Sequence, residues 1–554
     1  MSEPRAAPTS PTVAAGDEIA WFGFARKWWV LAVATPSVAL AEIAFTGLLF
    51  SNTQVLQGLD TDSYGYQWAT GPYMVLLVIW ALISVRLAAR YGSERVFLAG
   101  ALMTGAGCVI ASCAGSLATM VLGRLLMSTK GLVLSVALSQ MWLAFPRRKG
   151  LAMGVFNAAT YGGIFIGAAL GGFLEFQTSW RAIYATAGLS FLMLAVAGHR
   201  ALIHDRPARP VPLELNGLET ALLAVALAVG MLLVFRGQYY GWFDSDLIAF
   251  GAVAGGLAFA GFVWAALTSP DPLVNLRLGN FPTLALTLPV IAMFGAVTLG
   301  MLNTLPSYLN LRGYPSVVEG WVLFVPGVAI VLSCLASGFV YGRKWTVVAL
   351  WIGLAVNLGG GLWFYAADLY TAKETIVAML VVWALGAGVV FPTALRLTFA
   401  GQDPPAVRQL AGVKVALRFA ATVLGSFAVV VLIQRGTDIG QDLLRQRVDR
   451  NNPAYAQVME RVQQHVMARG SPRPIAMEQA GSVVGEWVTY NARMTGQRAG
   501  RRFLLALTGM AFVLALFIRL RPETSVLADD VHDIGWGWGD GAHAKAGAPH
   551  GTSG

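Results

Sequence analysis

Five charged side chains lie inside long apolar stretches of this sequence, where water should be scarce. One is a carboxylate and four are cations: Glu42, Arg124, Lys130, Lys414 and Arg418. Because a charge in hydrocarbon is costly unless it faces protein or water, such side chains usually carry a function. Desolvation favours the neutral form of a carboxyl group, whereas a neighbouring cation favours its charged form. A carboxyl group balanced between these two effects can take up a proton on one side of a barrier and release it on the other.

The cations indicate a site for negative charge. Lys414 and Arg418 are four residues apart, so on a helix they share one face and repel each other unless an anion answers them. The spacing fits either recognition of an acidic or anionic ligand group or side chains that extend to the membrane surface. Lys130 adds a further cation. With several buried cations against one acid, an anionic amphiphile fits better than a cationic one.

Asn157 and Tyr161 are weaker candidates for the same cavity. They are also four residues apart and share a helix face. Small polar side chains serve equally often to pack helices together in membranes, so both interpretations stay open.

Composition places all these side chains in a membrane protein. The chain has 554 residues, of which 56% are hydrophobic and 12% are charged, and its mean hydropathy is +0.62. A soluble protein of this length cannot hide that much apolar surface. The net charge is +10, but the basic residues are scattered between apolar runs and form no stripe interleaved with aromatics. We therefore expect no nucleic-acid partner.

The motifs of the common enzyme classes are missing. The sequence has no H-E-x-x-H, nucleophile motif, P-loop or carboxylate cluster, so we expect no enzymatic activity. The three cysteines and six histidines do not have the spacing of a metal site. We accordingly expect no metal and no cofactor other than a proton gradient.

Fourteen stretches are apolar and long enough, at about 20 residues, to span a membrane as helices. We expect them at 28–50, 67–88, 95–114, 117–142, 150–173, 181–199, 216–235, 247–267, 283–305, 317–340, 345–365, 373–396, 408–433 and 502–520. The first stretch is too long, and starts too far along the chain, for the core of a cleaved signal peptide.

The charges of the short connections predict the orientation. Alternate connections carry basic residues, namely Arg26, Lys27, Arg86, Arg90, Arg95, Arg147, Arg148, Lys149, Arg200, Arg206, Arg209, Arg277, Arg343, Lys344 and Arg408. The others carry acids, namely Asp60, Asp62, Glu175, Asp244, Asp246 and Asp368, with isolated bases such as Arg312. Because basic connections stay in the cytoplasm, both termini are predicted to be cytoplasmic.

This topology suggests a partner for the buried acid. At 1.5 Å rise per residue, Glu42 lies about 21 Å from the cytoplasmic start of its helix, and Arg124 lies about 10 Å from the outer end of its own. In a hydrocarbon core about 30 Å thick, both fall in the outer half. We expect Glu42 and Arg124 to pair, either as a proton-exchanging couple or as a permanent clamp between two helices.

One connection, from Gln434 to Gly500, is long, polar and charged, and the topology places it outside. Within it, apolar side chains recur at three- and four-residue spacing, at Tyr455, Val458, Met459, Val462 and Val466. This pattern predicts an amphipathic helix. Its apolar face would serve either as the packing face of a solvated hairpin cap or as a docking surface for a periplasmic partner.

Several stretches, in this order, resemble the major facilitator superfamily and, within it, the fourteen-helix drug:proton antiporter branch that includes EmrB-like exporters. They are QWATGPYMV (67–75), FPRRKGLAMGVFNAATYGGIFIGAALGG (145–172), SWRAIY (179–184) and LRFAATVLG (417–425). In the second stretch the resemblance assigns a helix-packing role to Gly163, Gly167, Gly171 and Gly172.

The resemblance implies an all-α major facilitator fold of two six-helix bundles plus a two-helix insertion. The expected segments are a disordered cytoplasmic tail (1–27), the N-terminal bundle (28–200), a linker with two extra helices (201–282), five helices of the C-terminal bundle (283–433), a periplasmic helical loop (434–500), the last spanning helix (501–521) and a cytoplasmic tail (522–554). Transport would follow from rocking of the two bundles about a midplane site.

The sequence departs from the branch at the predicted cytoplasmic gate. The family loop between helices 2 and 3 has a Gly and an Asp where VRLAARYGSER has Val85 and Ala89. Arg90 and Gly92 are retained in this loop, and we take them together with Arg86 as the gate residues. The missing Asp belongs to a charge latch in the family, so we expect that latch to be weakened or rebuilt.

The buried charges match the family unevenly. In helix 1 only the acid of the family motif persists, as Glu42. Arg124 is similar to the helix 4 arginine of the family's RxxQG, and Arg418 is similar to its helix 13 arginine. Lys414 matches no position of the motif.

Together these features predict a proton-coupled exporter, a drug or metabolite:proton antiporter of a bacterial inner membrane. It would move an amphiphilic, anionic small molecule out of the cytoplasm. The resemblance adds a periplasmic membrane-fusion adaptor as a partner for residues 434–500. A proton-independent exporter, a flippase-like carrier and a transport-inactive scaffold or sensor remain open alternatives.

Overall fold

The computed structural model describes residues 25–48, 52–146, 148–204, 216–237, 239–270, 272–275, 281–340, 345–447, 453–470 and 472–518. The predicted tails, 1–27 and 522–554, lie outside these residues except for 25–27. The regular elements of the described part are helices.

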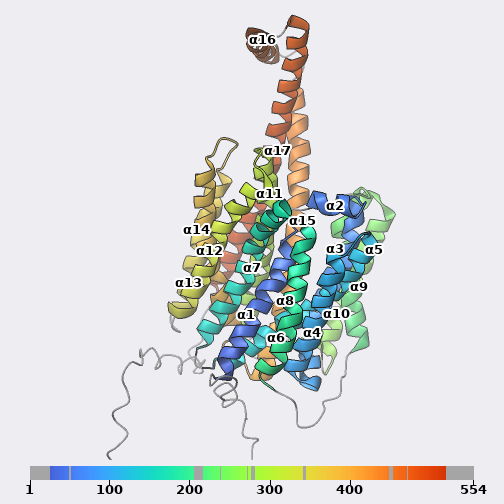
Figure 1. The fold of residues 1–554 in the computed structure, drawn as a ribbon, viewed down its shortest axis with the longest axis vertical. Coiled ribbons are helices and arrows are strands. Elements are labelled where there is room, and N and C mark those ends of the chain that lie inside the picture. Colours follow the sequence, from blue (N-terminus) through green and yellow to red (C-terminus); the bar gives the residue numbers. More distant parts are fainter. Residues whose placement is uncertain are drawn as a thin grey trace, which may run out of the picture.

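The helices fall into two bundles and a peripheral pair (Figure 1). The first bundle contains α1 (Arg26–Thr46), α2 (Asn52–Gly58), α3 (Ser63–Tyr91), α4 (Ser93–Ser112), α5 (Leu117–Met127), α6 (Lys130–Ala144), α7 (Lys149–Gln177) and α8 (Trp180–Ala201). The pair is α9 (Gly217–Arg236) and α10 (Asp246–Thr268), joined through the short 3-10 helix η2 (Trp242–Asp244). The second bundle contains α11 (Phe281–Leu311), α12 (Ser316–Val340), α13 (Thr346–Tyr365), α14 (Lys373–Phe399), α15 (Pro404–Arg447) and α17 (Arg473–Leu516), and α16 (Pro453–Ala468) lies outside it, between α15 and α17 in the chain.

The predicted number of spans is confirmed. In the described ranges, fourteen helical stretches are long and apolar enough to cross a membrane. Helices α5 and α6 together form one of them, Leu117–Ala144, which is interrupted by a turn at Ser128 and Thr129. This break separates Arg124 from Lys130.

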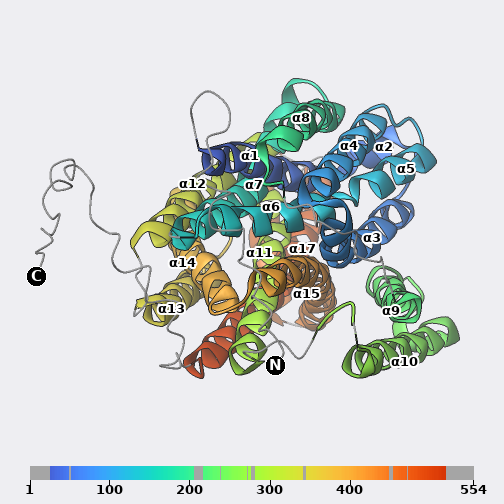
Figure 2. The ribbon, with the colours of Figure 1, turned by 90° about the horizontal axis from the view of Figure 1, so that it is seen from below.

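The two bundles contact each other through helix pairs that approach closely. Helix α7 packs along α12, and a Cβ added to Gly150 would lie 2.7 Å from the backbone oxygen of Gly338. Helix α3 packs against α15, where a Cβ on Gly412 would lie 2.5 Å from the backbone oxygen of Ala81. Because backbones touch directly, the bundles enclose the centre of the molecule on both sides (Figure 2).

The pair α9–α10 lies at the periphery, beside α3 (Figure 2). Only 17% of the α9 span and 22% of the α10 span are buried within the protein. Their exposed side chains include Val225, Leu247, Phe250 and Leu257. A surface of this kind fits contact with lipid rather than with water.

Helices α15 and α17 extend well beyond the bundles as a projecting hairpin (Figure 1). Each has 44 residues, which corresponds to about 66 Å of helix, roughly twice the hydrocarbon thickness. Residues 434–500 are therefore mostly continuations of these two helices. The reason is that polar side chains end an apolar stretch without ending the backbone hydrogen-bond ladder. We call the end with this hairpin the hairpin end, and the end with the α3–α4 and α6–α7 connections the opposite end.

The amphipathic helix predicted within this segment is α16, at the tip of the hairpin. It packs against α17. Tyr455, Met459, Val462 and Val466 are half-buried, whereas Val458 is exposed. Most of the apolar face is thus covered within the hairpin.

Candidate central site

An ion pair between Glu42 and Arg418 lies at the centre of the molecule. Arg418 Nη2 donates a hydrogen bond to Glu42 Oε1. The side chain of Glu42 is 0% exposed and that of Arg418 is 5% exposed. Glu42 belongs to α1 and Arg418 to α15, so the ion pair adds a charged contact between the bundles to the packing of α7 on α12 and of α3 on α15.

The pair leaves two buried polar atoms without partners. Glu42 Oε2 and Arg418 Nε have no hydrogen-bond partner among the described residues. Both side chains line a small cavity together with Tyr161 and Thr422. The cavity has room for about one water molecule. Glu42 Oε2 is therefore the carboxylate oxygen open to a proton.

Helix α7 fixes the position of α1 beside the acid. A Cβ on Gly163 would lie 2.7 Å from the backbone oxygen of Ala39 and 3.1 Å from Glu42 Cβ. Gly167 and Gly171 approach α1 just as closely, and Gly172 is buried as well. Since a side chain would push the helices apart, these predicted packing glycines keep Glu42 at its depth.

Arg124 is not the partner of Glu42, so the predicted pairing is wrong. Helix α1 packs on α6, α7 and α8, whereas Arg124 lies on α5 and faces α3 and α8. Its Nη2 donates to the hydroxyl oxygens of Tyr66 at 2.5 Å and Tyr184 at 3.0 Å, and its Nη1 donates to Thr70 at 3.5 Å. Equal depth does not fix the direction in which a side chain points.

Lys130 is enclosed by aromatic rings. Its Nζ lies 4.5 Å from the ring centre of Phe45, 4.9 Å from that of Phe419 and 5.6 Å from that of Tyr73. It also donates to the backbone oxygen of Ala41 at 3.2 Å. The ring faces and one carbonyl stabilise this cation, which is 1% exposed.

Lys414 lies one turn from Arg418 on α15 and is 2% exposed. Its Nζ lies 4.8 Å from the ring centre of Phe156, and no hydrogen bond to it occurs in the described part of the chain. Lys414 is thus buried and has no hydrogen-bonded anion among the described residues, and its burial argues against extension of its side chain to the membrane surface.

The two polar candidates on α7 behave differently. Tyr161 lines the cavity of the ion pair, and its ring stacks on Phe391 with 3.4 Å between the ring centres. Asn157 is buried, but its Nδ2 donates to the backbone oxygen of Met153 one turn earlier in the same helix. It does not line that cavity.

The predicted gate residues lie at the opposite end of α3. Arg86 and Arg90 are half-buried, and the Arg90 guanidinium lies 5.4 Å from the ring centre of Tyr91. Gly92 is the one residue between α3 and α4 and has φ of +87°. That backbone conformation favours glycine, which gives Gly92 a role in the turn.

Glu42 is not the lone buried acid that the sequence indicates. Glu94, Glu219 and Glu319 are buried too. They lie in the first turns of α4, α9 and α12, where a carboxylate complements the positive end of the helix. Glu42 differs because it lies in the last third of its helix and faces a cation.

A further buried cation that the sequence did not predict, Arg501 on α17, lies at the hairpin end. It is 2% exposed and donates to the backbone oxygens of Phe364 at 3.0 Å and Ala367 at 2.8 Å. These carbonyls end α13, so Arg501 joins α17 to the end of that helix.

The aromatic shell of the site was missed for a different reason. Phe45, Tyr66, Tyr73, Tyr184 and Phe419 contact the buried cations, but aromatic residues in apolar stretches are usually packing residues. A usable signal was the position of Phe45 three residues after Glu42, and of Phe419 directly after Arg418. The site therefore holds one buried acid, Glu42, and four buried cations beside aromatic rings. Among these five side chains, the Glu42–Arg418 ion pair runs between the bundles.

Comparison with known proteins agrees with this architecture. The family described as Major Facilitator Superfamily matches residues 28–426. The multidrug resistance protein Stp of Mycobacterium tuberculosis is 26% identical over 376 residues, which cover 66% of this chain and 68% of that protein. The tetracenomycin C resistance and export protein of Streptomyces glaucescens is 26% identical over 375 residues, 63% of this chain and 68% of that protein.

A solved structure shares the fold. The human organic anion transporter MFSD10 (TETRAN) superimposes with a TM-score of 0.58 at 14% sequence identity, over 88% of this chain and 99% of that one. At this identity the likeness concerns the fold alone.

Proposed function

The chain belongs to the major facilitator superfamily of membrane transporters, and we propose that it is a proton-coupled exporter of anionic amphiphiles. It is a multi-pass membrane protein and not an enzyme. The observation that carries the proposal is the Glu42–Arg418 ion pair, which joins the two bundles and leaves one carboxylate oxygen open.

The coupling follows from the chemistry of that pair. A proton added at Glu42 Oε2 neutralises the carboxylate, and Arg418 then loses its counter-charge. The contact between α1 and α15 weakens, so the bundles separate more easily around the centre. Loss of the proton restores the contact. Proton binding is thereby linked to alternating access, because it changes the stability of one arrangement of the bundles relative to the other.

The cations beside the pair support an anionic substrate. Lys414 has no hydrogen-bond acceptor among the described residues, and Lys130 is held mainly by rings. An acidic group that enters between the bundles would neutralise Lys414 and compete with Glu42 for Arg418. Substrate binding would then change the proton affinity of Glu42, and this linkage couples movement of the substrate to movement of the proton.

The setting we propose is a bacterial inner membrane with both termini in the cytoplasm. The distribution of basic and acidic connections supports it. The hairpin end then faces outward, and the hairpin of α15, α16 and α17 offers a periplasmic adaptor a surface about 30 Å from the membrane. Export as the direction of transport is supported by the similarity to the tetracenomycin C resistance and export protein.

The test is substrate-induced proton movement in proteoliposomes, followed with a pH-sensitive dye. We expect anionic amphiphilic dyes to move protons with the wild-type protein and not with Glu42→Gln. Glu319→Gln is the matched control, since it makes the same change at a buried acid in the first turn of α12. Proton movement that persists in Glu42→Gln would favour a proton-independent exporter or flippase-like carrier. Absence of any transport by the wild-type protein would favour the scaffold or sensor.

A further inference from the structure

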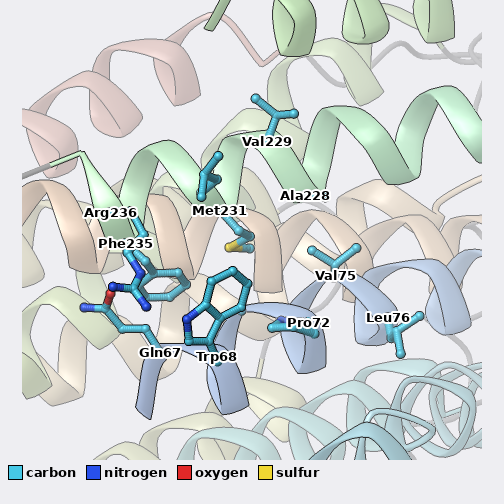
Figure 3. A pocket seen from close by; sticks show the side chains of 12 residues that line it. Gln67, Trp68, Pro72, Val75, Leu76, Ala228, Val229, Met231, Phe235 and Arg236 are labelled. Atoms are coloured by element: carbon cyan, nitrogen blue, oxygen red, sulfur yellow. The ribbon is translucent and has the colours of Figure 1, made fainter. Parts of the chain in front are cut away.

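A groove runs between α3 and α9 (Figure 3). It shares no lining residue with the cavity of the Glu42–Arg418 ion pair. Its volume is about 530 Å³, within the range of small-molecule sites. Small residues leave this space. Gly71 on α3 has only the ring of Phe235 within 4 Å of its Cβ position, and Ala228 on α9 offers little side chain. The groove is a feature of the peripheral pair and its junction with the first bundle.

The polar side chains of the groove gather at one end. Figure 3 shows Gln67 and Arg236 together there, whereas Val75, Leu76 and Val229 line the rest. Arg236 is the last residue of α9, so it lies at the hairpin end of that span. The groove is thus apolar along its length with a cation at the level where a lipid head group begins.

Arg236 has no counter-ion in the described residues. Its guanidinium lies 5.2 Å from the ring of Trp68 and 5.7 Å from the ring of Tyr239, and these are its contacts. Gln67 Oε1 is also buried without a hydrogen-bond donor. The end of the groove therefore offers a positive charge and an unpaired acceptor side by side.

We propose that the groove binds a phospholipid with an anionic head group that carries hydroxyl donors. The acyl chain lies along α3 and α9, the phosphate faces Arg236, and a head-group hydroxyl donates to Gln67. The occupant is a bilayer lipid because the groove opens beside the exposed apolar surface of α9 and α10, and Trp68, at its edge, is 55% exposed. Such a lipid would complete the junction between the peripheral pair and the first bundle.

Native mass spectrometry of the purified full-length protein tests the proposal without any transport assay. The probes are phosphatidylglycerol and phosphatidylcholine with identical acyl chains. The wild-type protein should retain phosphatidylglycerol preferentially. Arg236→Gln should weaken phosphatidylglycerol binding about fivefold, as expected for one basic residue near an anionic lipid, and should leave phosphatidylcholine unchanged.

Two further variants make the outcome decisive. Gly71→Leu should reduce binding of both lipids because its side chain fills the groove. Arg312→Gln is the matched control. Arg312 follows the hairpin end of α11, and its guanidinium lies 5.7 Å from the ring centre of Tyr308 and 5.2 Å from that of Tyr314. Arg312 does not line the groove. This variant should retain phosphatidylglycerol like the wild type. Equal retention of the two lipids by the wild type, or equal losses in Arg236→Gln and Arg312→Gln, would overturn the proposal.

Discussion

The pairing of Glu42 with Arg418 rather than with Arg124 makes a quantitative prediction for a double-mutant cycle. The Glu42 and Arg418 side chains are 0% and 5% exposed, so the pair belongs to the buried class. Removal of one partner from such a pair is worth about 3–5 kcal/mol. Each single change to Gln should therefore lower the free energy of unfolding by about 3–5 kcal/mol. Arg418→Gln also removes the contact of the guanidinium with the Phe419 ring, at 4.3 Å, so its loss should lie at the upper end of this range.

The double variant separates a direct pair from two independent effects. Once one partner is gone, the second change finds no ion pair to break. The coupling energy between Glu42→Gln and Arg418→Gln should thus be about 2–3 kcal/mol. Arg124 bonds to the hydroxyl groups of Tyr66 and Tyr184 instead, so its cycle with Glu42 should give less than about 0.5 kcal/mol.

The assay is unfolding in mixed micelles of a mild detergent and sodium dodecyl sulfate at neutral pH, with both cycles measured under the same conditions. The Arg124 cycle serves as an internal control, since Arg124 is an equally buried arginine in the same bundle as Glu42. A larger coupling with Arg124 than with Arg418 would refute the geometry on which the transport mechanism rests.

Four other changes probe the remaining features. Lys414→Met should raise the free energy of unfolding by on the order of 2–3 kcal/mol, because it removes a buried charge that has no counter-ion. Transport of anionic dyes should fall more than transport of cationic dyes. An unaltered preference between the two would argue against a role of Lys414 in anion recognition. Gly163→Ala should destabilise the protein by about 1–3 kcal/mol, because the added methyl group would press against α1. The control is Gly359→Ala, which has open space at its Cβ position and should be neutral or slightly stabilising. Equal effects of the two changes would contradict the close packing of α7 on α1. Glu219→Gln should weaken the bonds to the backbone N–H groups of residues 273 and 274 by about 1.5–3 kcal/mol, seen as faster amide hydrogen exchange there; unchanged exchange would count against them. Deletion of part of 434–500 should spare membrane insertion and abolish co-purification of an adaptor, and an adaptor that still co-purifies would exclude the hairpin as its docking surface.

The number of spans was predictable because it depends on a local property. An apolar stretch of about 20 residues has to cross the membrane as a helix, whatever its neighbours are. The same rule failed at the hairpin. Polar residues after Gln434 end the apolar stretch, yet α15 continues to Arg447 because a helix in water needs only its own hydrogen bonds.

The site was predictable in composition but not in pairing. Hydropathy identified Glu42, Lys130, Lys414 and Arg418 as buried charges, and burial is confirmed for all of them. Sequence position gives the depth of a residue, but not which helices face each other. The partner of Glu42 depends on the approach of α1 and α15, which come from different bundles. The aromatic enclosure of Lys130 depends on the same long-range packing.

In the mechanism that we propose, protonation of Glu42 links the pH gradient to movement of the bundles. The most direct measurement compares two transport modes of Glu42→Gln in proteoliposomes: accumulation of an anionic dye driven by a pH gradient, and exchange of labelled for unlabelled dye without a gradient. We expect gradient-driven accumulation to be lost while exchange persists, because exchange needs the bundles to move but needs no net proton transfer. Gradient-driven accumulation at the wild-type level in Glu42→Gln would contradict this mechanism.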